Sequence, residues 1–380
     1  MAGLKSRPFK TNLSKPEPFK AENDMLLEGL HIPLTTPFHA DGGLNLRKLA
    51  ANVERYSRTP AAGLMVLGPA GEPTLLSDDE TREVLRAAAE SAAPEKVLIA
   101  GISRDSVHAT LELARLAAEL SYDAVLVGKP GVLASFGIDR PQPDTRLREV
   151  LTYFQSVADR SPIPILLLNA RDRALPIDAV AELAAHPNII ALLDAQPHNV
   201  RSGAFERLLT RTAQVKHSVI VTSVFSAVTA RMQRAATAGT LIPTASLRGT
   251  ATTVAEPSAG ALRARTKSVG FQILAGDTEG MLDGLQAGAA GIAPAFAACA
   301  PQACYEVFAA WKDNDRPLAE EKQSRLDEAA YFAEEILGPG GLKFGCDLNG
   351  YFGGLPRLPH LPPDSEQRAA LERLMKELRN

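Results

Sequence analysis

Short unbroken runs of apolar residues alternate with longer amphipathic stretches from Gly29 onward. Runs without a polar alternation are typical of strands that are buried on both faces of a parallel sheet. They span residues 31–34, 64–67, 97–100, 124–127, 163–168, 189–193, 271–275 and 291–296. Between them, apolar residues recur at helical spacing, as in 105–120. Eight predicted strands, most followed by a helix, favour a (β/α)8 barrel.

Capping signals support this alternation. Ser77 precedes Asp78, Asp79 and Glu80, the pattern of a helix start with acidic residues in its first turn. Proline opens the predicted helices at 176–185 and 301–311. The competing architecture is a doubly wound open sheet, which would need a glycine-rich phosphate turn after its first strand. The sequence at 35–38, Thr-Thr-Pro-Phe, is no such turn, so the barrel is favoured.

The remaining segments do not fit the eightfold repeat. Residues 1–28 are predicted to be an N-terminal tail, 29–315 the barrel, and 316–380 a C-terminal extension with helices at 317–336 and 364–379 around the Gly/Pro-rich stretch 338–363. Residues 213–268 are too long for an ordinary loop and are predicted to be an insertion between the sixth helix and the seventh strand. Within it we expect a strand at 219–225, a helix at 226–236 and a loop at 249–257.

Composition narrows the classes of function. The chain has 41 basic and 44 acidic residues, a formal net charge of −3, which argues against nucleic-acid or anionic-membrane partners. No apolar signal segment follows the N-terminal lysines, and the apolar stretch 284–304 is broken by Pro294 and Pro301. Three cysteines without a CxxC pair fit a reducing, cytoplasmic location. The histidines are scattered, so no metal and no cofactor are predicted.

Several motifs, in matching order and spacing, resemble the dihydrodipicolinate synthase / N-acetylneuraminate lyase superfamily, which are pyruvate-dependent class I aldolases on a (β/α)8 barrel. The resemblance spans about 29–212 and 270–363. Its segments are Pro33 to Phe38, Gly68 to Glu72, Leu76 to Glu80, Ala100-Gly101, Ser161 to Pro164, His186 to Ile189, Leu274 to Asp277, and Gly288 to Gly291. The tail, with Gly341-Leu342-Lys343, Asp347 to Gly354 and Pro356-Arg357, looks most like the branch that includes 4-hydroxy-2-oxoglutarate aldolase.

This resemblance implies a lysine at the end of the sixth strand that forms a Schiff base with pyruvate. It also implies a proton-relaying tyrosine after the fifth strand, a second tyrosine after the fourth, and a Gly-Ser/Thr-x-Gly-Glu loop that binds the pyruvate carboxylate. It further implies a homo-oligomer, commonly a tetramer.

The sequence departs from that pattern at the residues that handle protons. The lysine position falls on Leu193, the first tyrosine on Leu168, and the second within 131–133. The hydroxyl pair of the carboxylate loop is Pro69-Ala70. Among the positions that keep the pattern, the predicted substrate-binding residues are Thr35, Thr36, Gly68, Gly71 and Arg173, the last near the family's carboxylate-binding arginine. Glu72 also keeps the pattern and is a catalytic candidate.

Three functions follow. The first is a barrel that has lost class I aldolase activity and binds a small carboxylate, such as a 2-oxo acid, or is structural. The second is an enzyme that acts on such an acid without an imine, through Glu72, Asp194 and Arg173. The third is an aldolase with a relocated Schiff-base lysine, Lys129, at the end of the fourth strand. Each acidic candidate also has a structural interpretation, in which it closes a loop or caps a turn.

Overall fold

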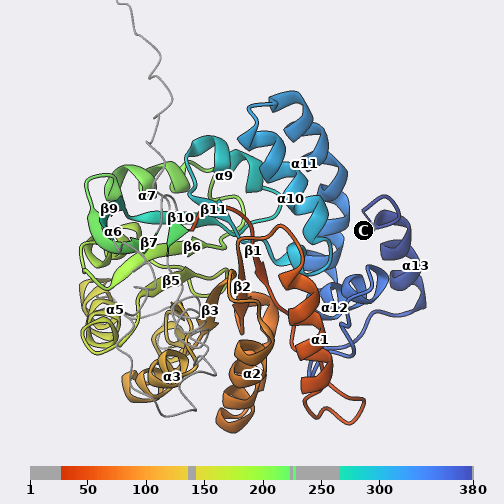
Figure 1. The fold of residues 1–380 in the computed structure, drawn as a ribbon, viewed down its shortest axis with the longest axis horizontal. Coiled ribbons are helices and arrows are strands. Elements are labelled where there is room, and N and C mark those ends of the chain that lie inside the picture. Colours follow the sequence, from red (N-terminus) through yellow and green to blue (C-terminus); the bar gives the residue numbers. More distant parts are fainter. Residues whose placement is uncertain (1–26, 136–142, 223–225, 228–264, 379–380) are drawn as a thin grey trace, which may run out of the picture.

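The computed structural model describes residues 27–135, 143–222, 226–227 and 265–378. Eight parallel strands form one sheet in the order β1-β2-β3-β4-β5-β6-β10-β11, and a bridge between Leu30 and Ile292 joins its two edges. The fold is therefore the predicted (β/α)8 barrel (Figure 1). The strands are β1 (His31–Pro33), β2 (Gly63–Val66), β3 (Val97–Gly101), β4 (Ala124–Gly128), β5 (Ile165–Asn169), β6 (Ile189–Asp194), β10 (Gln272–Ala275) and β11 (Gly291–Ile292).

Helices cover the outside of the barrel, and each packs its apolar stripe on the strands. They are α1 (Leu46–Ser57), α2 (Asp78–Ser91), α3 (Val107–Glu119), α5 (Pro143–Ala158), α6 (Ile177–Ala184), α7 (Ala204–Thr212), α9 (Met281–Ala287) and α10 (Pro301–Lys312). The start of α2 is the predicted capping box: the Ser77 hydroxyl accepts from the Glu80 N–H, and the Glu80 carboxylate accepts from the Ser77 N–H.

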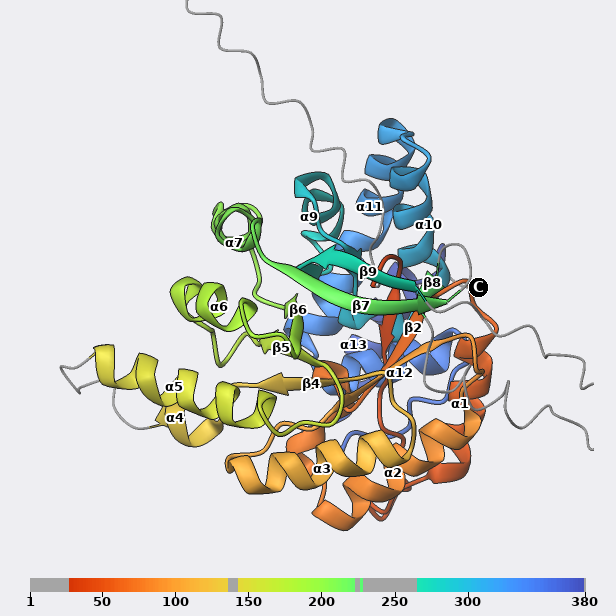
Figure 2. The same ribbon diagram turned by 60° about the vertical axis from the view of Figure 1, so that its left-hand side comes forward.

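A second sheet is inserted between α7 and β10. Its strands β7 (Lys216–Thr222) and β9 (Arg265–Gly270) run antiparallel and side by side (Figure 2). The strand predicted at 219–225 is β7, which begins three residues earlier than expected. The helix predicted at 226–236 is wrong at its start, because Ser226–Ala227 forms β8 and pairs with β7. The rest of that helix, the loop at 249–257 and nearly all of the tail at 1–28 lie outside the described residues.

The C-terminal extension continues from α10 as α11 (Arg316–Tyr331), a π-helical turn (Phe332–Ile336), α12 (Pro339–Leu348) and α13 (Ser365–Leu374). The helix α12 lies inside the Gly/Pro-rich segment, where no helix was predicted. Its proline is at the first turn, where a missing N–H costs nothing. Among the described helices, none is long and apolar enough to cross a membrane.

Within the extension, the backbone at Gly353 packs closely against the backbone of α12 at Lys343. A Cβ built on Gly353 would lie 1.8 Å from the carbonyl oxygen of Lys343, so only glycine fits where the chain returns past α12. The extension then crosses to the first two barrel loops through Arg357, whose guanidinium donates to both carboxylate oxygens of Glu80 and to the Gly42 carbonyl. The end of the chain is thereby held against the carboxyl ends of β1 and β2.

Candidate functional site

A cavity of about 410 Å³ lies at the carboxyl ends of the barrel strands. Its floor is apolar and includes Leu67, Leu126, Leu168 and Ala293. Loops after β2, β4, β5 and β10 supply its polar rim, and the C-terminal extension supplies another wall from 334–342. Active sites of (β/α)8 barrels are built at this end. The cavity is therefore the candidate site.

Below this floor the barrel interior is packed with apolar side chains. Leu193 on β6 is fully buried and lies in register with Leu168 on β5 and Leu274 on β10. A Cβ on Gly276 would lie only 2.8 Å from Leu193 Cδ1, so the surroundings of this side chain are tight. Leu193 and Leu168 are the positions that the resemblance assigns to the lysine and the tyrosine, and both contribute to this apolar packing.

Both cations and carboxylates border the cavity; the acidic side chains are Glu72, Asp172, Asp277, Glu334 and Glu335. Lys129 follows β4 and donates from Nζ to the Ala174 carbonyl at 3.0 Å. Arg171 and Arg173 follow β5; Arg171 pairs with Glu335 of the extension, and Arg173 Nε donates to Asp172 at 2.9 Å. All of these cations line the cavity. Asp172 engages Nε of Arg173, and the other N–H donors of that guanidinium suit an anionic group of a small molecule.

Glu72 is engaged elsewhere. Its Oε1 lies 2.5 Å from Nζ of Lys343 on α12, and in this ion pair the Glu72 side chain is 2% exposed and the Lys343 side chain 0%. Its Oε2 accepts a hydrogen bond from the backbone N–H of Arg357 at 3.0 Å. Lys343 also donates to the Leu355 carbonyl at 3.0 Å and lies over the Phe38 ring. Glu72 thus fastens the loop after β2 to the extension, although it borders the cavity.

The loop after β2 is held in an unusual conformation. Leu67 and Glu72 both have positive φ, 56° and 53°, a region that side chains other than glycine rarely adopt. Such residues persist where the surrounding structure fixes them, often at functional sites. The buried Thr36 hydroxyl donates to the Gly71 carbonyl at 2.6 Å, and Gly68 lines the cavity.

Thr35 and Asp194 are buried away from the cavity lining. The Thr35 hydroxyl lies 3.9 Å from Cys346 Sγ, a contact inside the protein. Asp194 accepts hydrogen bonds from Nδ2 of Asn169 at 2.7 Å and from Nδ2 of Asn199 at 2.9 and 3.0 Å. Burial raises the pKa of Asp194 above its ordinary value, against these hydrogen bonds. Its neighbour Ala195, rather than Asp194, borders the cavity.

Sequence reasoning missed Glu334. It lies in the π-helical turn of the extension and borders the cavity, where Oε1 accepts the Thr278 hydroxyl at 2.7 Å. Burial raises the pKa of Glu334 to about 7, and the nearby Asp277 adds to the shift, whereas hydrogen bonds from Thr278 and from the Phe296 N–H oppose it. In the sequence Glu334 is one acidic residue among many in a helix, with no signal that α11 ends over the barrel. Short π-helical segments are frequent at functional sites, but the sequence gives no signal for them and they are seen only in a structure.

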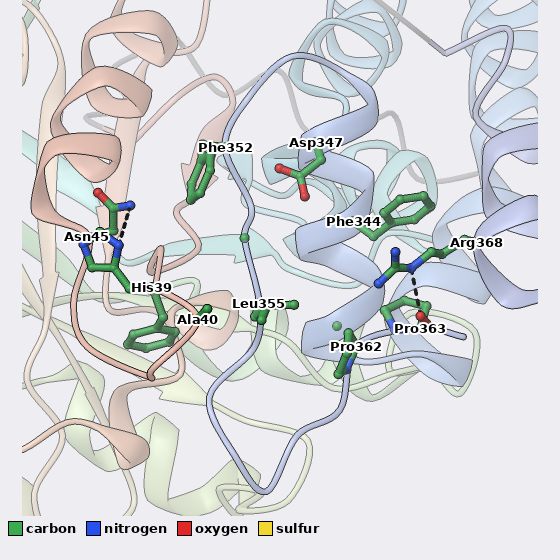
Figure 3. A pocket seen from close by; sticks show the side chains of 13 residues that line it. His39, Ala40, Asn45, Phe344, Asp347, Phe352, Leu355, Pro362, Pro363 and Arg368 are labelled. Atoms are coloured by element: carbon green, nitrogen blue, oxygen red, sulfur yellow. Dashed lines mark hydrogen bonds between the residues drawn. The ribbon is translucent and has the colours of Figure 1, made fainter. Parts of the chain in front are cut away.

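A second cavity of about 380 Å³ lies on the other face of α12 (Figure 3). His39 and Asn45 of the first loop face Phe344 and Arg368 of the extension across it. Leu342 borders the barrel cavity, and Phe344 borders this one, so the buried Lys343 lies in the wall between the two. Among the described residues, no group of three His, Cys, Asp or Glu side chains is placed to hold a metal ion.

A family model described as the dihydrodipicolinate synthetase family matches residues 26–252 and 254–378. The chain belongs to this family. The family resemblance found in the sequence is thereby confirmed, and the matched residues include the insertion and the extension.

Relatives and solved structures in this family agree with the fold. The 4-hydroxy-tetrahydrodipicolinate synthase of Acidiphilium cryptum is 27% identical over 355 residues, which are 92% of this chain and 98% of the relative. That of an Exiguobacterium species is 34% identical over 173 residues, and the match spans only 56% of the relative's length. The crystal structure of a dihydrodipicolinate synthase from Bacillus anthracis has a TM-score of 0.70 at 20% identity, covering 93% of this chain and 99% of that one.

Proposed function

We propose that this dihydrodipicolinate synthetase family member binds a small organic carboxylate, such as a 2-oxo acid, at the barrel mouth and forms no imine on β6. The observation that carries the proposal is Arg173, a rim arginine whose carboxylate partner is exposed, above an apolar floor. Lys129, Arg171 and Arg173 border the cavity, whereas the side chain below it on β6 is Leu193. A leucine has no nitrogen for a Schiff base, so the class I aldolase reaction has no nucleophile at this strand.

Arg173 is the proposed carboxylate ligand. Its guanidinium has five N–H donors, of which Nε is engaged by Asp172, and the fork geometry suits a carboxylate. Asp172 is itself exposed, so its charge is shared with solvent and holds the arginine only weakly. The substrate-binding roles predicted for Thr35, Thr36, Gly68 and Gly71 remain proposals. The Thr36–Gly71 hydrogen bond supports a role in shaping the loop, whereas the Thr35 hydroxyl contacts Cys346 of α12.

A second candidate function is an aldolase that uses Lys129. The observation in its favour is that Lys129 borders the cavity at the end of β4. Against it, Nζ of Lys129 already donates to the Ala174 carbonyl, and attack on a keto carbon to form an imine would break that hydrogen bond. The enzyme without an imine, which would use Glu72 and Asp194, is less supported, because both carboxylates are occupied by the contacts described above.

The test is borohydride trapping with pyruvate, read by intact and peptide mass, together with pyruvate titration by calorimetry. We expect pyruvate binding without a covalent adduct. Arg173→Ala should weaken binding about tenfold or more, since a hydrogen bond to a charged group contributes roughly 1.5–3 kcal/mol. Arg82→Ala is the matched control, because Arg82 pairs with Asp79 on the outside of α2. An adduct on Lys129 would instead establish the relocated aldolase.

Two further expectations belong to the proposal. We propose a cytoplasmic homo-oligomer with neither nucleic acid nor membrane as partner; the tetramer rests on the family resemblance. Leu358 and Leu361 in the extension are 73% and 70% exposed, and apolar side chains this exposed favour a subunit contact. Light scattering after size exclusion tests the assembly, and Leu358→Ser with Leu361→Ser should shift it toward the monomer.

A further inference from the structure

Five carboxylates border the barrel cavity, and three of them are held in ion pairs; Glu334 and Asp277 are not, in the described part of the chain, and Asp277 instead accepts the backbone N–H of His198. Glu72 is paired with Lys343, Glu335 with Arg171, and Asp172 with Arg173. Glu334 has no ion pair within 4 Å in the described part of the chain. Its carboxyl accepts only from uncharged donors, the Thr278 hydroxyl and the Phe296 N–H. A carboxyl so placed changes its protonation readily, because no fixed cation holds it ionised.

The groups around Glu334 come from four elements. Asp277 lies in the loop after β10, Arg171 in the loop after β5, and Glu335 is its neighbour in the π-turn. Cys299, two residues before α10, and Cys304, within its first turn, are buried, and burial raises the pKa of both thiols, so they stay neutral. Asp277 disfavours the carboxylate form of Glu334, and Arg171, already paired with Glu335, favours it only in part.

The position of the acceptors decides where a proton on Glu334 points. Two protein donors, from Thr278 and Phe296, already face this carboxyl. The added O–H needs an acceptor, and the carboxyl borders the cavity. An oxygen of a ligand bound by Arg173, which borders the same cavity, would supply that acceptor.

We propose that protonated Glu334 donates a hydrogen bond to the bound acid and so selects 2-oxo acids over 2-amino acids. The inference rests on the proposed carboxylate binding. A keto oxygen accepts a hydrogen bond from the carboxyl O–H. An ammonium group has no lone pair and can only donate, so it leaves that O–H without an acceptor. The same group links ligand binding to uptake of one proton above neutral pH.

The experiment compares pyruvate with alanine, which differ at the carbon next to the carboxylate, by calorimetry from pH 6 to 8.5. Pyruvate affinity should be level near pH 6 and fall about tenfold by pH 8, because only the protonated fraction of Glu334 binds. Alanine should bind at least about tenfold more weakly than pyruvate at pH 6. Glu334→Gln, which keeps a donor at all pH values, should bind pyruvate with the same affinity across the range.

Asp327→Asn is the matched control. Asp327 lies in the same extension, burial raises its pKa, and it does not border the cavity, so this variant should keep the wild-type pH dependence. Pyruvate binding that is independent of pH in the wild type, or that keeps its pH dependence in Glu334→Gln, overturns the role of Glu334 alone. A wild-type chain that binds neither acid at any pH overturns the proposed function as well. Thermal unfolding of each variant shows that loss of binding is not loss of fold.

Discussion

Lys343 and Glu72 form a buried ion pair that joins the last part of the chain to the loop after β2, with Nζ 2.5 Å from Oε1. Burial lowers the pKa of Lys343, while the Glu72 carboxylate acts in the opposite direction. The Phe38 ring, 4.1 Å from Nζ, adds a cation–π contact. Each charge is acceptable inside the protein only because the other is present.

Lys343→Met should therefore destabilise the chain strongly. Removing one partner of a buried pair leaves an uncompensated charge, which costs about 3–5 kcal/mol. The double variant Lys343→Met with Glu72→Gln should recover part of that loss, measured as free energy of unfolding in urea. Additive losses in the double variant would show that the two charges do not depend on each other.

The ion pair between Glu80 and Arg357 should make the free energy of unfolding depend on pH in the acidic range. The Arg357 guanidinium lowers the pKa of Glu80 to about 2, from an ordinary value near 4.5. A lowered carboxyl pKa gives stability that is complete above pH 4.5 and is lost as the pH falls toward 2. Glu80→Gln keeps the capping contact with Ser77, so it should be less stable than wild type at pH 7, with most of that difference gone at pH 2, where about half of the wild-type carboxyl is protonated.

Urea unfolding at several pH values checks this prediction. Glu83→Gln, a change at an exposed carboxylate on the same helix, is the control and should leave the acid dependence unaltered. A difference between wild type and Glu80→Gln that persists undiminished at pH 2 would place the effect in packing rather than in the ion pair.

The apolar layer around Leu193 predicts that a lysine is poorly tolerated there. Leu193→Lys should lose about 3 kcal/mol or more of unfolding free energy, since the ammonium would be buried without a partner. Leu193→Met keeps volume and apolar character and should cost less than about 1.5 kcal/mol. A stable Leu193→Lys variant that is trapped with pyruvate by borohydride would show that the layer still admits an imine.

Asp194 is predicted to act on the structure and not on the ligand. Asp194→Asn turns one acceptor into a donor facing Asn169 or Asn199, at a cost of about 1–3 kcal/mol. Pyruvate affinity at pH 6, measured on the folded variant, should stay within about twofold of wild type. A larger change in affinity would return Asp194 to the binding site.

The barrel could be predicted from the sequence because its signals are local. Each buried strand appears as an unbroken apolar run, and the Ser77 cap lies within four residues of its partner. The placement of Leu193 and Leu168 in one layer follows from strand register, which the apolar runs already imply. The predictions at 226–236 and 338–363 were wrong because they relied on local composition. The observed strand at 226–227 forms by pairing with β7, and the helix α12 contacts residues distant in the sequence, such as Glu72.

The candidate site could be predicted only in part. Lys129 and Arg173 follow strands, and strand ends meet at one face of a barrel. Glu334 and Lys343 reach the same face from the far end of the sequence, by a turn and a helix whose docking depends on Arg357 and Gly353. Such contacts between distant segments leave no periodic mark in the sequence. The same contacts show that Glu72 holds the loop after β2 against the extension.

The wall formed by residues 334–342 has a consequence for the order in which the parts of the binding cavity form during folding. The eight strands end at β11, so the sheet can close before the last wall of the cavity is in place. A ligand that contacts this wall and the strand ends together would add to the contacts that already hold the extension, so an occupied protein should resist protease cleavage near the π-helical turn more than an empty one.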